Sequence, residues 1–223
     1  MARRIIGAFE KTADTYDDWY HKPIGSHAFK SELKGLKKLL PPTGTGVDIG
    51  AGTGIFAEQL TTDQRKIICI DPSTEMLKAA NRRRLETIMA VSEALPIKLE
   101  SIDFSYMVTV LEFLPEPLTT LESIRDMLKD DSPLVILFIN KESSWGERYS
   151  EQARDGDPIF SHAKIYKLED VSALLKGSNF DPEDSVGTLT APPDKPGREV
   201  ALVPAGPETG VILIKARKMG IDQ

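Results

Sequence analysis

Residues 47–54 read Val-Asp-Ile-Gly-Ala-Gly-Thr-Gly, a short apolar strand that runs into three alternate glycines. Residues 55–60 follow with a helical pattern, so the segment predicts a strand, a tight turn and a helix. Glycine has no Cβ to hold a ligand away, and the first turn of a helix presents unpaired N–H groups and a positive dipole end. The turn therefore predicts a binding site for an anionic group.

The spacing of the glycines distinguishes this turn from two well-known phosphate-binding patterns. No Lys followed by Ser or Thr comes after the glycines, as a P-loop requires, and the dinucleotide fingerprint needs a glycine where this chain has Ile55. The turn suits a smaller anion, such as an amino-acid carboxylate. Asp48, just before the turn, could face the ammonium group of the same amino acid, directly or through water.

A second acid follows at the usual distance for a carboxylate that binds ribose hydroxyls. Asp71 ends the next predicted strand, about 20 residues beyond Gly50. Pro72 and Ser73 then lead into a helix that would direct Met76 back toward the ligand, where its thioether could pack on a purine. These residues predict a nucleoside next to the glycine turn.

Short apolar runs alternate with amphipathic stretches along the chain, which is typical of a parallel α/β sheet. Five parallel strands are predicted, followed by two strands with no helix between them that form an antiparallel pair. A helical cap over residues 1–40 precedes a domain over residues 41–223, and the path of the Pro- and Gly-rich residues 191–210 is not predictable. The predicted strands are 46–49, 66–70, 87–91, 104–110, 134–139, 180–190 and 211–217, and the predicted helices are 9–20, 29–40, 74–84, 118–128 and 168–176.

Composition and charge restrict the class of protein. The 223 residues are 40% hydrophobic and 28% charged, as in ordinary globular chains, and the net charge of −6 disfavours a nucleic-acid surface. We interpret the one basic run, Arg82 to Arg84, as the complement of a helix dipole rather than an RNA-binding patch. Cys69 stands alone in an apolar run, so no disulfide framework or metal site is expected.

The same composition predicts a location and a kind of partner. No apolar run approaches the roughly 20 residues of a membrane span, and the N-terminal apolar stretch is too short for a signal peptide. We therefore expect a cytoplasmic protein with a small, neutral or cationic substrate and with neither membrane nor nucleic-acid partners. The oligomeric state is not indicated.

Three successive segments, 47–54, 70–77 and 93–96, resemble the motifs of class I S-adenosylmethionine-dependent methyltransferases in order and spacing. The resemblance extends over roughly residues 16–217, because residues 16–20 look like the aromatic lead-in of the small-molecule branch. It implies a Rossmann-like, doubly wound sheet of seven strands, mostly parallel with an antiparallel last strand. It also implies S-adenosylmethionine as cofactor and methyl transfer to a small molecule.

The resemblance also implies roles for individual residues. The glycine turn would hold the methionine part of the cofactor, Asp71 the ribose hydroxyls, and Met76 the adenine, with Ser92 and Glu93 at its border. The complete implied set is Tyr16, Asp48, Gly50, Ala51, Gly52, Asp71, Pro72, Met76, Ser92, Glu93, Thr109 and Val110. One departure is Val91, which stands where many relatives have an Asp that pairs with the adenine amino group.

Methyl transfer is an in-line displacement at an activated methyl group, so a catalytic base is optional. Open doubly wound sheets bind ligands beyond the carboxyl ends of their strands, which places residues 109–112 and 140–144 near the reaction. His21, beside the aromatic lead-in, is the first candidate for a proton acceptor. Glu112 stands where many relatives carry His, and it either alters substrate choice or places a carboxylate at the rim.

Two other functions and one unassigned segment stay open at this stage. A nicotinamide-dependent oxidoreductase would share the glycine turn and the acid that binds ribose, but it conflicts with Ile55. A non-catalytic regulator that binds S-adenosylmethionine is also compatible, because no motif identifies a catalytic base. Residues 141–166 either shape the substrate pocket or form a surface excursion packed by its own aromatic residues.

Overall fold

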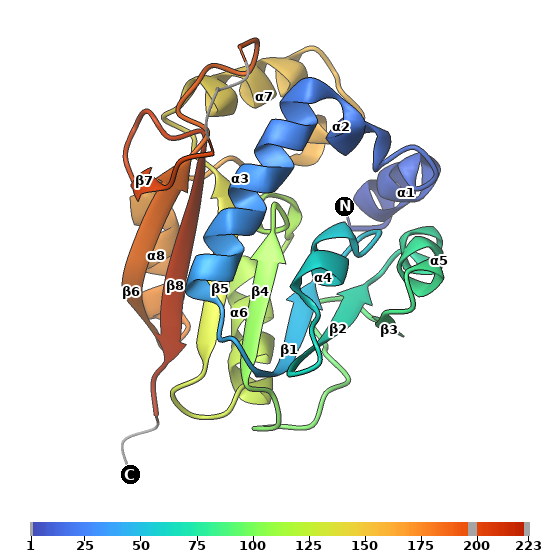
Figure 1. Cartoon of the computed structure of the whole chain (residues 1–223), viewed down its shortest axis with the longest axis vertical. Helices are drawn as coiled ribbons and strands as arrows, with labels where there is room; N and C mark the ends of the chain where they lie inside the picture. Colours follow the sequence, from blue (N-terminus) through green and yellow to red (C-terminus); the bar gives the residue numbers. More distant parts are fainter. Residues whose placement is uncertain (1, 196–199, 221–223) are drawn as a thin grey trace.

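The computed structural model describes residues 2–195 and 200–220. Its centre is one mixed sheet with the strand order β3-β2-β1-β4-β5-β8-β6-β7 (Figure 1). The strands are β1 (Gly44–Ile49), β2 (Arg65–Asp71), β3 (Glu86–Met89), β4 (Phe104–Val108), β5 (Pro133–Ile139), β6 (Phe180–Thr188), β7 (Val203–Pro204) and β8 (Val211–Lys218). The predicted Rossmann-like α/β class is confirmed.

The pairing of the strands follows the predicted pattern. Strands β1 to β5 pair in parallel, whereas β8 runs antiparallel to both β5 and β6. The sheet has one strand more than the seven expected. This strand is β7, which has two residues, lies within residues 191–210 and pairs with β6. Residues 196–199 of that stretch lie outside the described residues, as do Met1 and residues 221–223.

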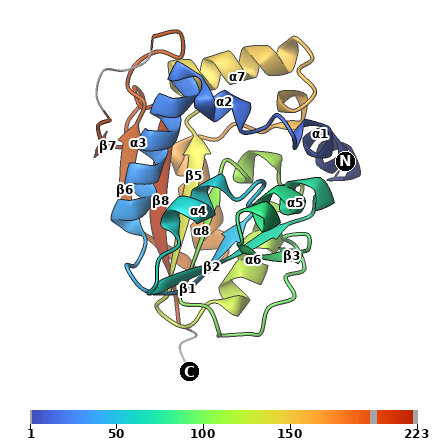
Figure 2. The ribbon, with the colours of Figure 1, turned by 45° about the vertical axis from the view of Figure 1, so that its right-hand side comes forward.

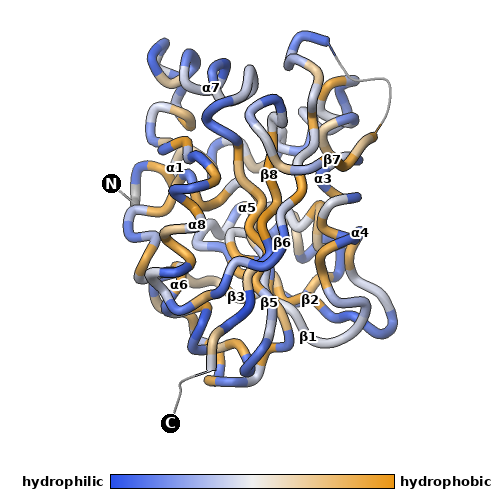
Figure 3. Tube along the Cα trace, turned by 90° about the vertical axis from the view of Figure 1, so that its left-hand side faces the viewer, coloured by the Kyte–Doolittle hydropathy of each residue, from blue (hydrophilic) through white to orange (hydrophobic). Residues whose placement is uncertain are grey.

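Helices cover both faces of the sheet. Side chains alternate along each strand, so Val135 and Leu137 of β5 pack with α3 and α4, whereas Leu134 and Ile136 pack with α6 and α8. Hydrophobic residues accordingly gather along the central strands (Figure 3). The helices are α1 (Ala2–Thr12), α2 (Asp18–His21), α3 (Pro23–Leu39), α4 (Ile55–Leu60), α5 (Thr74–Arg82), α6 (Pro117–Met127), α7 (Ser144–Arg154) and α8 (Leu168–Gly177), with short 3-10 turns η1 (Leu111–Phe113) and η2 (Phe160–His162).

The N-terminal helices differ from the sequence prediction. A single helix over 9–20 is wrong, because α1 ends at Thr12 and a turn over residues 13–17 separates it from α2. Thr and Asp in this turn favour local side-chain hydrogen bonds over helix, as the Thr15 hydroxyl donating to the Thr12 carbonyl illustrates. Helix α3 begins at Pro23, earlier than predicted, because proline is well tolerated at the first helical position.

Helices α1, α2 and α7 gather at one end of the sheet. Figure 2 shows α1, α2 and α7 beyond the carboxyl ends of the parallel strands. Helix α7, which was not predicted, lies within the segment 141–166. Within the described ranges, no helix is long and apolar enough to cross a membrane.

A glycine in β1 sets the closeness of two central strands. A Cβ added at Gly46 would overlap the fully buried ring of Phe104 on β4. We expect Gly46→Ala to lower the free energy of unfolding by about 1–3 kcal/mol in urea denaturation, because the ring has no room to move. Gly7→Ala is the control, since that helical site is open and alanine there should add about 0.5–1 kcal/mol. An unchanged unfolding midpoint for Gly46→Ala would contradict this packing.

Candidate functional site

The glycine turn after β1 has the backbone conformation that glycine favours. Gly50 and Gly52 have φ values of +66° and +55°. A Cβ on Gly50 would come within 2.5 Å of the Val110 side chain, whereas one on Gly52 would meet only the Met76 sulfur, at 3.9 Å. Gly50 is therefore required by packing, and Gly52 leaves space next to Met76.

Asp71 joins this turn to the next strand and helix. One carboxylate oxygen accepts a hydrogen bond from the Gly52 N–H at 2.9 Å, and the other from the Ser73 N–H at 2.8 Å. Burial raises the pKa of Asp71, and these two hydrogen bonds lower it in part. The glycine turn and the Asp71 motif, which were both predicted from the sequence, thus meet at the Asp71 carboxylate.

A cavity of about 890 Å³, counting the solvent at its mouth, opens above this point. Its walls contain ten of the twelve residues that the sequence resemblance implies: Tyr16, Gly50, Gly52, Asp71, Pro72, Met76, Ser92, Glu93, Thr109 and Val110. Ile5, Ile6 and Phe9 of α1 also line it and were not predicted. Their apolar spacing on one side of a short helix was the signal that could have identified them.

The remaining two residues, Asp48 and Ala51, do not line this cavity. Asp48 lies on the other face of β1, where its carboxylate accepts a hydrogen bond from the Tyr106 hydroxyl at 2.9 Å. Burial raises the pKa of Asp48 to about 8, and the Tyr106 hydrogen bond offsets part of that rise. The Ala51 N–H donates to the Ile70 carbonyl of β2, so this N–H group is already hydrogen-bonded within the protein.

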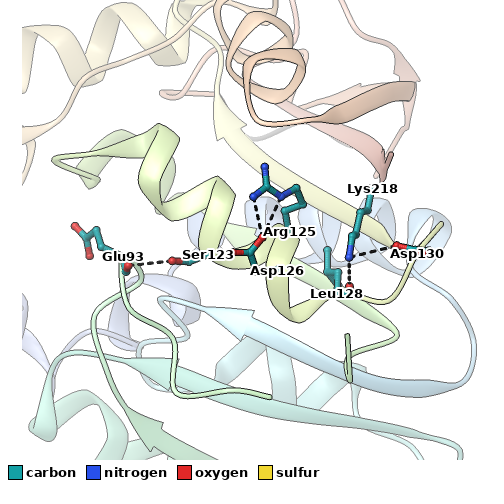
Figure 4. A network of polar contacts seen from close by, with 7 residues as sticks. All are labelled: Glu93, Ser123, Arg125, Asp126, Leu128, Asp130 and Lys218. Carbon is teal, nitrogen blue, oxygen red and sulfur yellow. Dashed lines mark hydrogen bonds and ion pairs between the residues drawn. The ribbon is translucent and has the colours of Figure 1, made fainter. Parts of the chain in front are cut away.

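The loop after β3 is held in place by α6. The Ser123 hydroxyl donates to the Glu93 carbonyl at 2.9 Å, as Figure 4 shows. The hydroxyls of Ser92 and Thr120 also lie within hydrogen-bond distance, at 3.1 Å. These contacts fix the border of the cavity opposite the glycine turn.

An ion-pair cluster attaches the segment before α2 to the same turn. Asp17 accepts a hydrogen bond from the Thr53 hydroxyl at 2.7 Å and pairs with Arg83 at 2.7 Å. Arg83 also pairs with Glu58 of α4 at 3.2 Å. The arginine run predicted to complement the α5 dipole thus also supplies a partner for Asp17, and this contact holds the neighbouring Tyr16 over the cavity.

A second cavity meets the first at four shared residues, Phe9, Tyr16, Thr109 and Phe113. Thr109 stands just beyond the carboxyl end of β4 with φ = +50°, an unusual conformation for a β-branched residue. Such strain is common at functional sites, where the surrounding structure maintains it. The junction at Thr109 is therefore the point where two ligands could meet.

Half of the residues that line the second cavity are aromatic. Tyr149 of α7 stacks on Phe160 with ring centroids 4.3 Å apart, and Phe160 in turn contacts Phe113. The segment 141–166 thus lines a cavity, and two of its own aromatic residues also pack on each other. The complete lining is Phe9, Tyr16, Trp19, Tyr20, Glu32, Thr109, Phe113, Ile139, Trp145, Tyr149, Gln152, Asp157, Ile159, Phe160, Leu189 and Val211.

Two carboxylates are buried at this cavity. Glu32 of α3 lines it and is 6% exposed, while Glu112 lies behind the wall and is 1% exposed. The pKa of each is raised to about 7, mainly by burial, and the charge of Glu112 contributes to the rise at Glu32. Sequence reasoning missed Glu32, although an acid within the apolar stripe of a helix, between Ala28 and Leu36, could have identified it.

The two residues predicted as catalytic have different surroundings. Glu112 accepts a hydrogen bond from the Ile139 N–H at 2.7 Å with one oxygen, and its other oxygen is buried without a partner among the described residues. His21, at the end of α2, is exposed and is not among the residues that line either cavity. The geometry thus brings Glu112 close to the second cavity and leaves His21 outside it.

Comparisons with known proteins indicate the family of the chain. A family model described as a methyltransferase domain matches residues 47–136. An uncharacterised protein of Methanocaldococcus jannaschii is 31% identical over 96% of this chain and all of its own. A ubiquinone biosynthesis O-methyltransferase of Xylella fastidiosa is 27% identical over 54% of this chain and 52% of its own.

A solved structure is similar over nearly the whole chain. It comes from Thermotoga maritima and is described as an S-adenosylmethionine-dependent methyltransferase and possible histamine N-methyltransferase. The TM-score is 0.86 with 29% identity, over 96% of this chain and 99% of that one. The likeness therefore extends beyond the sheet to most of the N-terminal cap.

The buried carboxyl of Glu32 predicts a pH-dependent stability. Its folded pKa of about 7 lies above the ordinary 4.5, so its contribution is complete below about pH 4.5 and is lost as pH rises through 7. Glu32→Gln removes this loss, and we expect its stability advantage over wild type in urea denaturation to grow by about 2 kcal/mol between pH 5.5 and 8.5. Glu122→Gln, at an exposed site, is the control. An advantage independent of pH would contradict the raised pKa.

Proposed function

The chain belongs to the class I S-adenosylmethionine-dependent methyltransferases, and from this premise we propose that it methylates a small molecule bound in the second cavity. The observation that carries the proposal is the junction at Tyr16 and Thr109, where that cavity meets the one above the glycine turn. In-line transfer requires donor and acceptor to approach each other from opposite sides of the methyl group. Two cavities that meet at one point suit this geometry.

The first cavity fits S-adenosylmethionine, the cofactor of this family. We assign the methionine part to the glycine turn at Gly50 and Gly52, because its open side at Gly52 admits a ligand close to the backbone. Asp71 would bind the ribose hydroxyls, and Met76 with Ser92 would border the adenine. When bound, the cofactor supplies a methyl group that its sulfonium makes electrophilic.

The chain's own residues would position the reactants and exclude water. Tyr16 and Thr109 lie at the junction, and the strained backbone of Thr109 fixes the edge past which the acceptor must approach. Ile5, Ile6 and Phe9 of α1 add an apolar wall above the first cavity. Exclusion of water strengthens every electrostatic interaction within such a site and prevents hydrolysis.

Several observations support a small acceptor. The second cavity is bounded by α2, α3 and α7 and is lined mainly by aromatic and aliphatic side chains, as is usual for sites that bind small organic molecules. The net charge of −6 disfavours a nucleic-acid substrate. The description of the Thermotoga maritima protein names histamine, itself a small molecule.

Calorimetry and thermal unfolding with candidate cofactors test the proposal. S-adenosylhomocysteine should bind and raise the melting temperature, whereas NAD should do neither, because only a ligand of the folded state stabilises it. Methyl transfer from labelled S-adenosylmethionine to a panel of metabolites, histamine among them, should then yield product. Binding of NAD in place of S-adenosylhomocysteine would favour an oxidoreductase, and binding without transfer to any panel member would favour a regulator.

Gly52→Ala tests the assignment of the glycine turn. The new methyl group would enter the space beside Met76, so we expect affinity for S-adenosylhomocysteine to fall by roughly tenfold or more in calorimetry. Gly156→Ala is the matched control, because Gly156 also has a positive φ, of +84°, but faces open space. Each variant should lose about 1–2 kcal/mol of stability, yet only Gly52→Ala should lose affinity. Equal affinities would contradict the assignment.

A further inference from the structure

The second cavity, called the aromatic cavity below, has one acidic side chain on its wall that is almost entirely buried, that of Glu32. Its carboxylate faces a cavity whose other lining is mostly rings, including Trp19, Tyr20 and Tyr149. Among the side chains that the structure describes, those of residues 4–195 and 200–220, it has no hydrogen-bond donor and no Lys, Arg or His partner. A buried carboxylate without a partner is costly, so this arrangement is expected where a ligand supplies the partner.

The surroundings of Glu32 favour a positive ligand. Glu112 adds a second buried acid with one unpaired oxygen, and the hydroxyls of Tyr16 and Tyr149 carry raised pKa values, mainly through burial and in part through the charge of Glu32. The faces of aromatic rings attract cations, most strongly when water is excluded. The carboxylate and the aromatic rings thus both favour a cationic ligand.

The chemistry of the wall indicates an organic cation rather than a metal ion. Among the described residues, no group of three or more His, Cys, Asp or Glu side chains could hold a metal. Rings such as those of Trp145 and Phe160 offer no ligand atoms to a hard cation, but they pack well on an organic body. The cavity therefore matches a small molecule with an apolar body and one positive group.

We propose that the acceptor is a small organic amine, bound as its ammonium ion between Glu32 and the aromatic rings, and that Glu32 accepts the proton that the nitrogen must lose. The inference rests on the proposed function and specifies its substrate class. The shared residues Phe9, Tyr16, Thr109 and Phe113 connect the amine's cavity directly to the cofactor's. An amine held at Glu32 thus has a path to the transferable methyl group.

The proton and the electron pairs balance in this scheme. The ammonium transfers one proton to Glu32, whose carboxylate becomes a carboxylic acid. The nitrogen lone pair then forms the new N–C bond while the methyl–sulfur bond breaks, and the electrons of that bond stay on sulfur. The methylated product leaves as an ammonium ion, and Glu32 releases its proton to solvent. Burial, which raises the pKa of Glu32 to about 7, suits it to accept a proton near neutral pH.

Calorimetry on protein saturated with S-adenosylhomocysteine tests the inference without relying on turnover. The probes are primary amines that carry a phenyl, indole or imidazole ring on a two-carbon chain, each beside the alcohol of the same skeleton. We expect at least one amine to bind roughly tenfold more tightly than its alcohol, because only the amine pairs with the carboxylate. Glu32→Gln should remove this preference, while the variant still unfolds cooperatively and binds S-adenosylhomocysteine with wild-type affinity. Glu122→Gln, at an exposed site on α6, should keep the preference.

The outcomes distinguish failure of the amine assignment from failure of the methyltransferase proposal. Protein that binds S-adenosylhomocysteine but none of the amines, or that binds amines and alcohols equally, overturns the amine assignment and leaves the methyltransferase proposal standing. Retention of amine affinity in Glu32→Gln also overturns it. Protein that fails to bind S-adenosylhomocysteine overturns both.

Discussion

Two backbone N–H groups, from Gly52 and Ser73, donate to the carboxylate of Asp71, and the site depends on this arrangement. It joins the turn after β1 to the start of α5, so the ends of two neighbouring strands form one rigid floor. Because Asp71 is 8% exposed, loss of either hydrogen bond would leave a buried charge poorly solvated. The positive φ of Gly52 follows from the same requirement, since its N–H must point toward the acid.

The N-terminal elements add the second half of the site to this floor. Asp17 pairs with Arg83 and accepts from Thr53, which places Tyr16 over the turn and between the two cavities. The same cap brings Glu32 into the aromatic cavity from α3. In the proposed assignment, cofactor recognition depends mainly on backbone geometry, whereas acceptor recognition depends on side chains from segments far apart in the sequence.

This division explains what the sequence could predict. The glycine turn and Asp71 have fixed spacing along the chain, and the order of strands follows from local apolar patterns, so both were predicted. Asp48 was assigned to the cofactor, but the alternation of β1 turns it toward Tyr106, a contact visible only once strands pair. The position of Glu32 on a cavity wall was not predicted, because α7 and η2 complete that wall only through tertiary packing.

The central claim is that the two cavities hold donor and acceptor on opposite sides of one junction. A crystal structure with S-adenosylhomocysteine tests it most directly. The account predicts the sulfur of that ligand beside Tyr16 and Thr109, the ribose on Asp71 and the adenine against Met76, with the aromatic cavity left open to the acceptor. Ligand density within the aromatic cavity, or a sulfur remote from Thr109, would contradict it.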